Sequence, residues 1–113
     1  ETMTDYARVF DGAADDIGHA KHALVDRRGG ACVLGAVGLV TGAVSRKNEH
    51  GHYWYERTSS LEWSRSVKIL ASHHDAAKTE YDLVVWNNNP DTSGDDVIDL
   101  LRRAAKAERE ATQ

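Results

Sequence analysis

Residues 29–45 read GGACVLGAVGLVTGAVS, a run with no charged residue, five glycines and the only cysteine of the chain. A helix that is apolar on every side must be covered by the rest of the fold, so this run predicts the centre of the domain. We expect a buried helix over residues 31–43; because short apolar runs do not distinguish helix from strand, a buried strand over residues 31–34 is the alternative. Three glycines spaced three and four residues apart would let a neighbouring helix approach closely: Gly35, Gly38 and Gly42.

The same run does not have the composition of a membrane-spanning helix. A helix that crosses a bilayer needs about 20 predominantly apolar residues. These seventeen residues include five glycines, a threonine and a serine. The sequence therefore predicts no membrane span.

Length and composition indicate one small domain. The chain has 113 residues, enough to bury a single core. We interpret Met3 as the natural start, so that residues 1–2 are an addition and residues 3–113 form one helical domain. A net charge of −4, from 14 Lys and Arg against 18 Asp and Glu, argues against nucleic acid as the main partner. One cysteine cannot form an internal disulfide and the start resembles no secretory signal, so a cytoplasmic location is expected.

Helical periodicity predicts an amphipathic helix near each end of the chain. The first covers residues 5–26, with Thr4 as its N-cap and the cations and glycines of residues 27–30 as its end. The last covers residues 94–110, with Thr92 or Ser93 as its N-cap. Four cations of this last helix should lie largely on its solvent-facing side: Arg102, Arg103, Lys106 and Arg109.

The middle of the chain contributes one further helix and less regular segments. Ser59 and Glu62 have capping-box spacing and predict a helix over residues 60–74. Residues 45–60 have no helical period and predict a long loop or a short hairpin, whereas residues 83–86 predict a short strand or a buried turn. The expected fold is all-α, a compact bundle of about four helices around the central glycine-rich helix.

Two fragments carry a resemblance to a known pattern. They are GACVLGAV at residues 30–37 and LVVWNNNPDTSGDDVIDLLRRAAK at residues 83–106. Together they resemble an uncharacterised domain family of actinobacteria and their phages, which has a Cys-Leu-Leu-Gly-Ala segment and a downstream Trp-Asn-Asp before the final helix. The matching positions are Cys32, Leu34, Gly35, Ala36, Trp86 and Asn87, and Asn88 stands where the family usually has Asp. The resemblance implies a bacterial or phage protein of the cytoplasm and brings no established activity with it.

A metal site is one reading of the first predicted helix. Asp15, His19, His22 and Asp26 lie at i, i+4, i+7 and i+11, which places them within about 60° on the face opposite the apolar stripe. Imidazole and carboxylate are suitable ligands for zinc or nickel. The alternative is a solvated polar face with ordinary Asp-to-His pairs. Four further histidines form no recognised ligand motif, and no metal or cofactor is predicted: His50, His52, His73 and His74.

Cys32 is the candidate thiol nucleophile of the chain. In the first turn of the central helix, the helix dipole would lower its thiol pKa, and a nearby histidine would be needed as the base. The alternative is a small hydrophobic residue that fills space in a buried run. The sequence contains no nucleophile elbow and no phosphate-binding loop, so a non-enzymatic role is favoured.

Aromatic residues in the predicted loop form the preferred candidate for a binding site. Tyr53, Trp54 and Tyr55 lie next to Arg57, and Trp, Tyr and Arg are enriched at protein interfaces. Stacking on single-stranded nucleic acid uses the same residue types, but the acidic charge argues against it. We therefore predict a small non-enzymatic interaction or regulatory module, such as a phage accessory protein that binds a host protein or its own copy. The alternatives are a His/Asp metal-binding protein and an enzyme that depends on Cys32.

Overall fold

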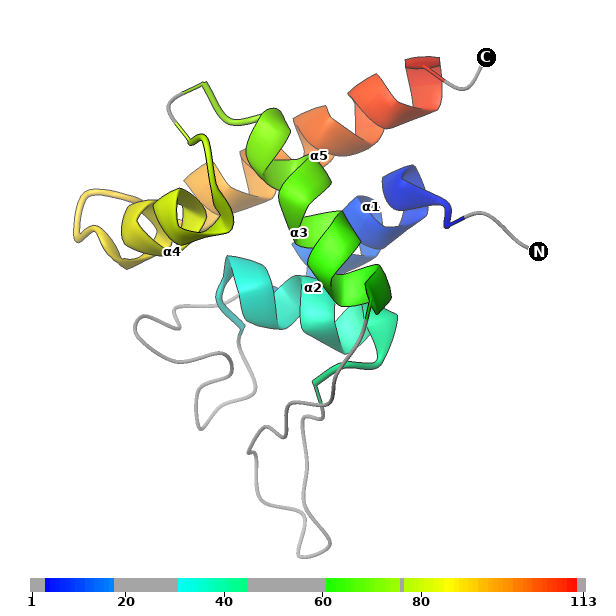
Figure 1. Cartoon of the computed structure of the whole chain (residues 1–113). Coiled ribbons are helices and arrows are strands. Elements are labelled where there is room, and N and C mark those ends of the chain that lie inside the picture. Colours follow the sequence, from blue (N-terminus) through cyan, green and yellow to red (C-terminus); the bar gives the residue numbers. More distant parts are fainter. Residues whose placement is uncertain (1–3, 18–30, 45–60, 76, 112–113) are drawn as a thin grey trace, which may run out of the picture.

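The computed structural model describes residues 4–17, 31–44, 61–75 and 77–111 (Figure 1). Within these residues the chain forms helices and no strand, which confirms the all-α prediction. There are five helices in the described part: α1 (Tyr6–Asp16), α2 (Val33–Thr41), α3 (Leu61–Ser72), α4 (Glu80–Asn88) and α5 (Gly94–Ala111). None of them is both long enough and apolar enough to cross a membrane.

The glycine-rich run forms the central helix, α2. It packs against α1, α3 and α4, and Val33, Ala36 and Val37 have no exposed surface. The helix begins after Cys32, which is extended, and it ends at Gly42, whose φ of 82° is the left-handed conformation that glycine adopts without strain. The prediction of a buried central helix is confirmed, and the alternative of a strand over residues 31–34 is wrong.

α1 is shorter than the predicted helix over residues 5–26. It ends at Asp16, and the next residue, Ile17, is extended and forms an isolated parallel bridge with Ala31. The backbone N–H of Ala31 donates to the carbonyl of Asp16 at 3.0 Å. The segment that leads into α2 therefore supplies a hydrogen-bond donor to the last residue of α1. The N-cap is Asp5, not Thr4, because the Asp5 carboxylate accepts from the backbone N–H of Arg8 at 3.1 Å. Residues 18–26 lie outside the described residues.

α4 replaces the predicted strand or turn at residues 83–86. Its N-terminus carries a capping box, in which Thr79 and Asp82 each bond the other's backbone N–H. Leu83 and Asn87, one turn apart, face the interior, while Tyr81 and Val85 are exposed. Apolar residues on both faces remove the helical period from the sequence, so the helix was not predicted.

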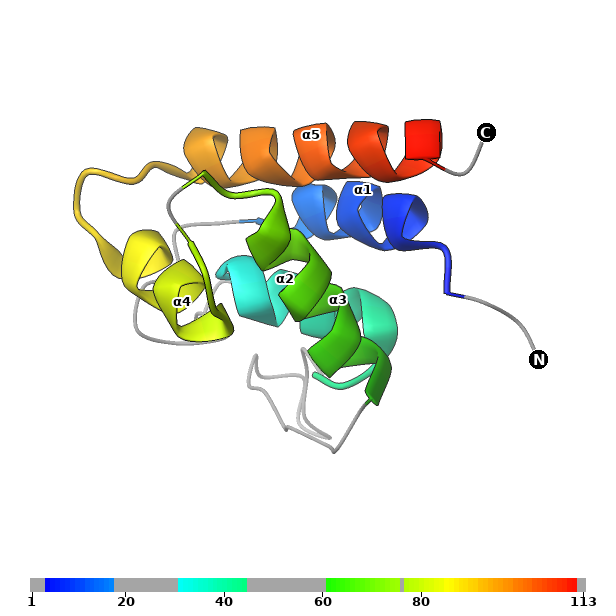
Figure 2. The same ribbon diagram turned by 45° about the horizontal axis from the view of Figure 1, so that its top comes forward.

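α1 and α5 lie side by side along one edge of the molecule, with α2 and α3 crossing beneath them (Figure 2). Both helices carry small residues that are buried, including Ala13, Ala14, Ala104 and Ala105. They allow the two backbones to approach closely.

Ion pairs run along the solvent side of the α1–α5 contact. Arg102 donates to Asp11 Oδ1 at 3.0 Å and to Asp15 Oδ1 at 2.8 Å, and Arg109 donates to Asp11 Oδ2 at 2.6 Å. These two arginines are half exposed, as the sequence predicts for this face, yet they reach back to α1. Asp11 is therefore the carboxylate that both arginines share.

Replacing Asp11 with asparagine should lower the free energy of unfolding by about 1 kcal/mol near neutral pH, because two exposed charge-assisted bonds are lost. The hydrogen bond from Arg109 holds the pKa of Asp11 below its ordinary value of 3.8, although desolvation opposes it. A carboxyl with a depressed folded pKa stabilises the fold above its unfolded pKa and loses that contribution as the pH falls through the folded pKa. The difference between the native chain and Asp11→Asn in urea unfolding should thus shrink as the pH drops below 3.8.

The control for this prediction is Asp99→Asn, which removes a single exposed pair with Arg103 within α5. This substitution should lower the free energy of unfolding by only a few tenths of a kcal/mol. Equal losses for the two variants would contradict the assignment of Asp11 as the shared partner.

Candidate functional site

The two fragments that carry the family resemblance meet at the N-terminus of α2. The side chain of Asn87, near the C-terminal end of α4, accepts a hydrogen bond from the backbone N–H of Val33 through Oδ1 at 3.1 Å. Asn87 is buried, and this bond satisfies one of the N–H groups that a helix start leaves without a partner inside the helix. The contact therefore joins positions 54 residues apart in the sequence.

Asn88 holds the amide of Asn87 in this orientation. The Nδ2 of Asn87 donates to Oδ1 of Asn88 at 3.2 Å, which leaves Oδ1 of Asn87 for Val33. An aspartate at residue 88 would accept the same bond through a carboxylate oxygen. Asn88 thus supplies the acceptor that orients the Asn87 amide, which is a structural role.

Cys32 is the N-cap of α2. Its Sγ accepts from the backbone N–H of Gly35 at 3.3 Å, and only 8% of the residue is exposed. Burial raises the pKa of the Cys32 thiol above its ordinary value of 9.0, and the backbone bonds from Gly35 and Leu34 only partly offset that effect. The prediction that the helix dipole would lower this pKa is wrong, because desolvation outweighs the backbone N–H groups. The thiol is therefore protonated near neutral pH.

An alkylation experiment tests this description of Cys32. In the folded protein at neutral pH, iodoacetamide should modify Cys32 at least tenfold more slowly than a free thiol such as glutathione, because the thiolate is scarce and the sulfur is covered. Mass spectrometry of the intact chain measures the rate. In urea the rate should rise to that of the free thiol. Fast modification of the folded chain would restore the reading of Cys32 as a reactive nucleophile.

The histidines at the end of α3 are tied to neighbouring segments. The Nδ1 of His74 accepts from the backbone N–H of Ala77 at 3.1 Å, and its ring meets Trp86 edge-on with centroids 4.6 Å apart. The Nε2 of His73 lies 2.8 Å from a carboxylate oxygen of Glu108 on α5. Both side chains thus connect α3 to later parts of the chain.

Of the four predicted metal ligands, the described part of the chain contains Asp15 alone, so the metal site stays a prediction. There, no three His, Cys, Asp or Glu side chains are grouped so that they could hold a metal ion. Asp15 accepts from Arg102 instead. His19, His22 and Asp26 lie outside the described residues, as do His50 and His52.

The predicted aromatic patch also lies outside the described residues, which include neither Tyr53, Trp54 and Tyr55 nor Arg57. Trp63, at the start of α3, is described and has a structural role. Its Nε1 donates to the carbonyl of Leu34 at 3.0 Å, and the ring packs on the core.

The outward face of α4 is a surface that the sequence reasoning missed. Among the large apolar residues of the described segments, Tyr81 is 73% exposed and Val85 is 51% exposed, one helical turn apart. Tyr81 lines two shallow grooves, and Val85 lines one of them. One groove, of about 420 Å³, is lined by residues of α4 and the following turn: Tyr81, Val84, Val85, Asn88, Asn89 and Pro90. We call this set the α4 surface.

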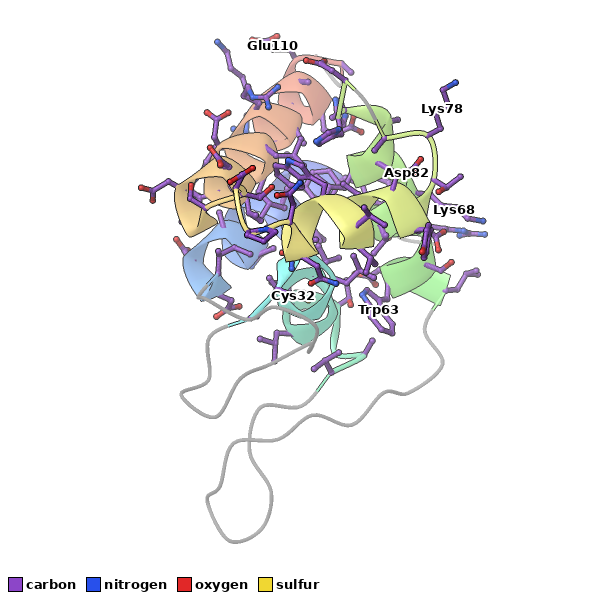
Figure 3. All side chains as sticks on the ribbon, turned by 90° about the vertical axis from the view of Figure 1, so that its left-hand side faces the viewer. Cys32, Trp63, Lys68, Lys78, Asp82 and Glu110 are labelled. Carbon is purple, nitrogen blue, oxygen red and sulfur yellow. The ribbon has the colours of Figure 1, made fainter. Side chains whose placement is uncertain are left out.

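The second groove, of about 460 Å³, lies at the N-terminal end of α4. It is lined by Lys68, Ala71, Lys78, Thr79, Glu80 and Tyr81. Figure 3 looks onto α4 and shows Lys68, Lys78 and Asp82 gathered at this end. The only sequence signal for the α4 surface was the apolar stretch at residues 83–86, which was interpreted as a short strand or a buried turn.

Comparison with known proteins adds one finding. The sequence profile of a family of unknown function, DUF6197, matches residues 1–107. No curated protein and no solved structure matches the chain. The match covers nearly the whole sequence, including Cys32, which caps α2, and Asn87, which bonds to Val33 at the start of α2. The chain therefore belongs to the DUF6197 family.

Proposed function

We propose that this protein is a non-enzymatic interaction module that binds a partner protein through the α4 surface. The observation that supports this function is the exposure of Tyr81 and Val85 beside two grooves on one short helix. Tyrosine is enriched among the residues that dominate binding energy, and exposed apolar groups gathered on one face of a small domain mark interaction sites. The buried and protonated thiol of Cys32 favours binding over nucleophilic catalysis.

The setting that we propose follows from the resemblance described above. The protein would act in the cytoplasm of an actinobacterium, encoded by the bacterium or by its phage, and would regulate the protein that it binds. The aromatic residues 53–55 and Arg57 remain a predicted second contact for the same partner.

The test compares three forms of the purified chain as baits in a lysate of an actinobacterial host. The forms are the native chain, the double variant Tyr81→Ser/Val85→Ser, and Val40→Ser, which changes an exposed valine on α2. Proteins captured by the native chain are identified by mass spectrometry, purified and titrated by calorimetry. We expect the double variant to bind the purified partner at least tenfold more weakly, because side chains that anchor an interface carry most of its binding energy.

The affinity of Val40→Ser for the purified partner should lie within about twofold of that of the native chain. Circular dichroism should show that all three forms are equally helical, since surface substitutions have small effects on stability. If the double variant binds every purified partner as tightly as the native chain, the α4 surface is not the docking site and the proposed function is wrong.

A further inference from the structure

We infer that the α4 surface is coupled to the first turn of the central helix, and that Asn88 is the residue that couples them. The juxtaposition that carries this inference is a row of two hydrogen bonds, which runs from the groove beside Val85 to the first backbone N–H of α2. The inference rests on the proposed function for the event that acts on Asn88, namely a partner docked in this groove. The coupling itself belongs to the fold.

Asn88 takes part in both the surface and the interior. It lines the groove beside Val85 and is half-buried. Its Oδ1 accepts a hydrogen bond from Nδ2 of Asn87 at 3.2 Å. Asn87 is buried and faces the interior from α4. A change at the side chain of Asn88 therefore acts directly on a buried amide.

The amide of Asn87 caps α2 in one orientation. Its Oδ1 must face Val33, whose backbone N–H donates to it at 3.1 Å, and its Nδ2 then faces Asn88. Turning the amide over would bring the donor Nδ2 toward the donor N–H of Val33, and two donors cannot bond. The bond to Asn88 therefore favours the orientation in which the start of α2 is capped.

Cys32 lies between two anchored residues at this start. Before it, the N–H of Ala31 donates to the carbonyl of Asp16 at 3.0 Å, and after it, Val33 is bonded to Asn87. Figure 3 shows Cys32 at the end of α2 next to α4. Loss of the Val33 bond would release the second anchor, so that the first turn of α2 opens and uncovers the Cys32 thiol.

Opening of this turn is a local event. The part of α2 that follows, including Ala36 and Val37, is buried, and the helix packs against α1 and α3. A local opening breaks fewer contacts than global unfolding and needs less free energy. A partner that binds Asn88 as it is oriented here would hold the turn closed, because a ligand stabilises the conformation to which it binds.

The experiment uses two probes of the first turn in the full chain without urea. One is the rate at which iodoacetamide modifies Cys32, and the other is the hydrogen exchange of the Val33 amide measured by NMR. Asn88→Ala removes the acceptor for Asn87 and should raise both rates about fivefold, because a neutral hydrogen bond changes an opening equilibrium by roughly that factor. Circular dichroism should show that this variant is as helical as the native chain.

Two matched variants assign the effect to the hydrogen bond. Asn88→Asp keeps an oxygen that accepts from Asn87, and both of its rates should lie within about twofold of those of the native chain. Val85→Ser changes the same groove outside the row of hydrogen bonds and should also stay within about twofold.

A third variant separates local opening from global unfolding. Asp11→Asn weakens the contact between α1 and α5 and should change either rate less than about twofold. Four results would overturn the inference: unchanged rates in Asn88→Ala, a loss of its helicity, equal acceleration by Asn88→Asp or Val85→Ser, or equal acceleration by Asp11→Asn.

The inference and the proposed function fail in different ways, because both rates are measured without a partner. If Asn88→Ala leaves the rates unchanged while Tyr81→Ser/Val85→Ser loses the purified partner, the docking site stands and the coupling is wrong. If Asn88→Ala accelerates both probes while the double variant binds every partner as tightly as the native chain, the coupling stands and the proposed function is wrong.

Discussion

Replacing Asn87 with alanine should lower the free energy of unfolding by about 2–3 kcal/mol, because the buried N–H of Val33 then has no acceptor. The cost is larger than that of an ordinary exposed cap, since no water replaces the lost oxygen at a buried site. Urea unfolding followed by far-UV circular dichroism measures the effect. The m-value should stay unchanged, because the amount of surface exposed on unfolding is the same.

Two neighbouring substitutions act as controls for the Asn87 contact. Asn87→Asp keeps an oxygen that accepts from Val33 and should lose clearly less stability than alanine, since a carboxylate is favourable at a helix N-terminus. Asn88→Asp keeps an acceptor for Asn87 Nδ2, so its effect on the free energy of unfolding should be close to zero. If Asn87→Ala is as stable as the native chain, the contact between the two family fragments contributes nothing to the fold.

Gly38→Ala should destabilise the protein by about 2 kcal/mol, although helix propensity alone predicts a gain of about 1 kcal/mol for this exchange. Gly38 lies inside α2, and a Cβ there would overlap a methyl group of Val44 and touch the ring of Trp63. Val44 is buried and β-branched, so its side chain cannot rotate away cheaply. Steric overlap therefore outweighs propensity at this position.

A double-mutant cycle tests the cause of this loss. Val44→Ala alone should cost about 1–2 kcal/mol by removing buried methyl groups. Combined with Gly38→Ala, it should cost less than the sum of the two single changes, because the space that it opens receives the new methyl group. Thermal unfolding of the four chains gives the coupling. Additive losses would show that Val44 is not what excludes a side chain at residue 38.

The fold class could be predicted because it depends on local patterns. The uncharged run at residues 29–45 identified the central helix α2. The helical spacing of apolar residues identified α5. The end of α1 could not be predicted, because a bridge between Ile17 and Ala31 sets it, and that bridge depends on tertiary structure. α4 was missed because Leu83 faces the core while Val85, two residues on, faces solvent, so no helical period remains.

The candidate site was less predictable than the fold. The family fragments pointed to Cys32 and Asn87, but the hydrogen bond to Val33 becomes visible only when α2 and α4 are placed together. The sign of the pKa shift of Cys32 depends on how deeply the sulfur is covered, which the sequence does not state.

The pairing of α1 with α5 has a consequence for the order of events during synthesis. α1 packs against α2 as well as α5, and its contact with α5 can form only after Leu100 and Leu101 have left the ribosome. Contacts between such distant residues close a long loop and slow the search for the native state. A nascent chain in which α5 is still missing exposes the apolar face of α1, which makes it a substrate for chaperones and proteases. The part of the core between α1 and α5 therefore forms late in the synthesis of this domain.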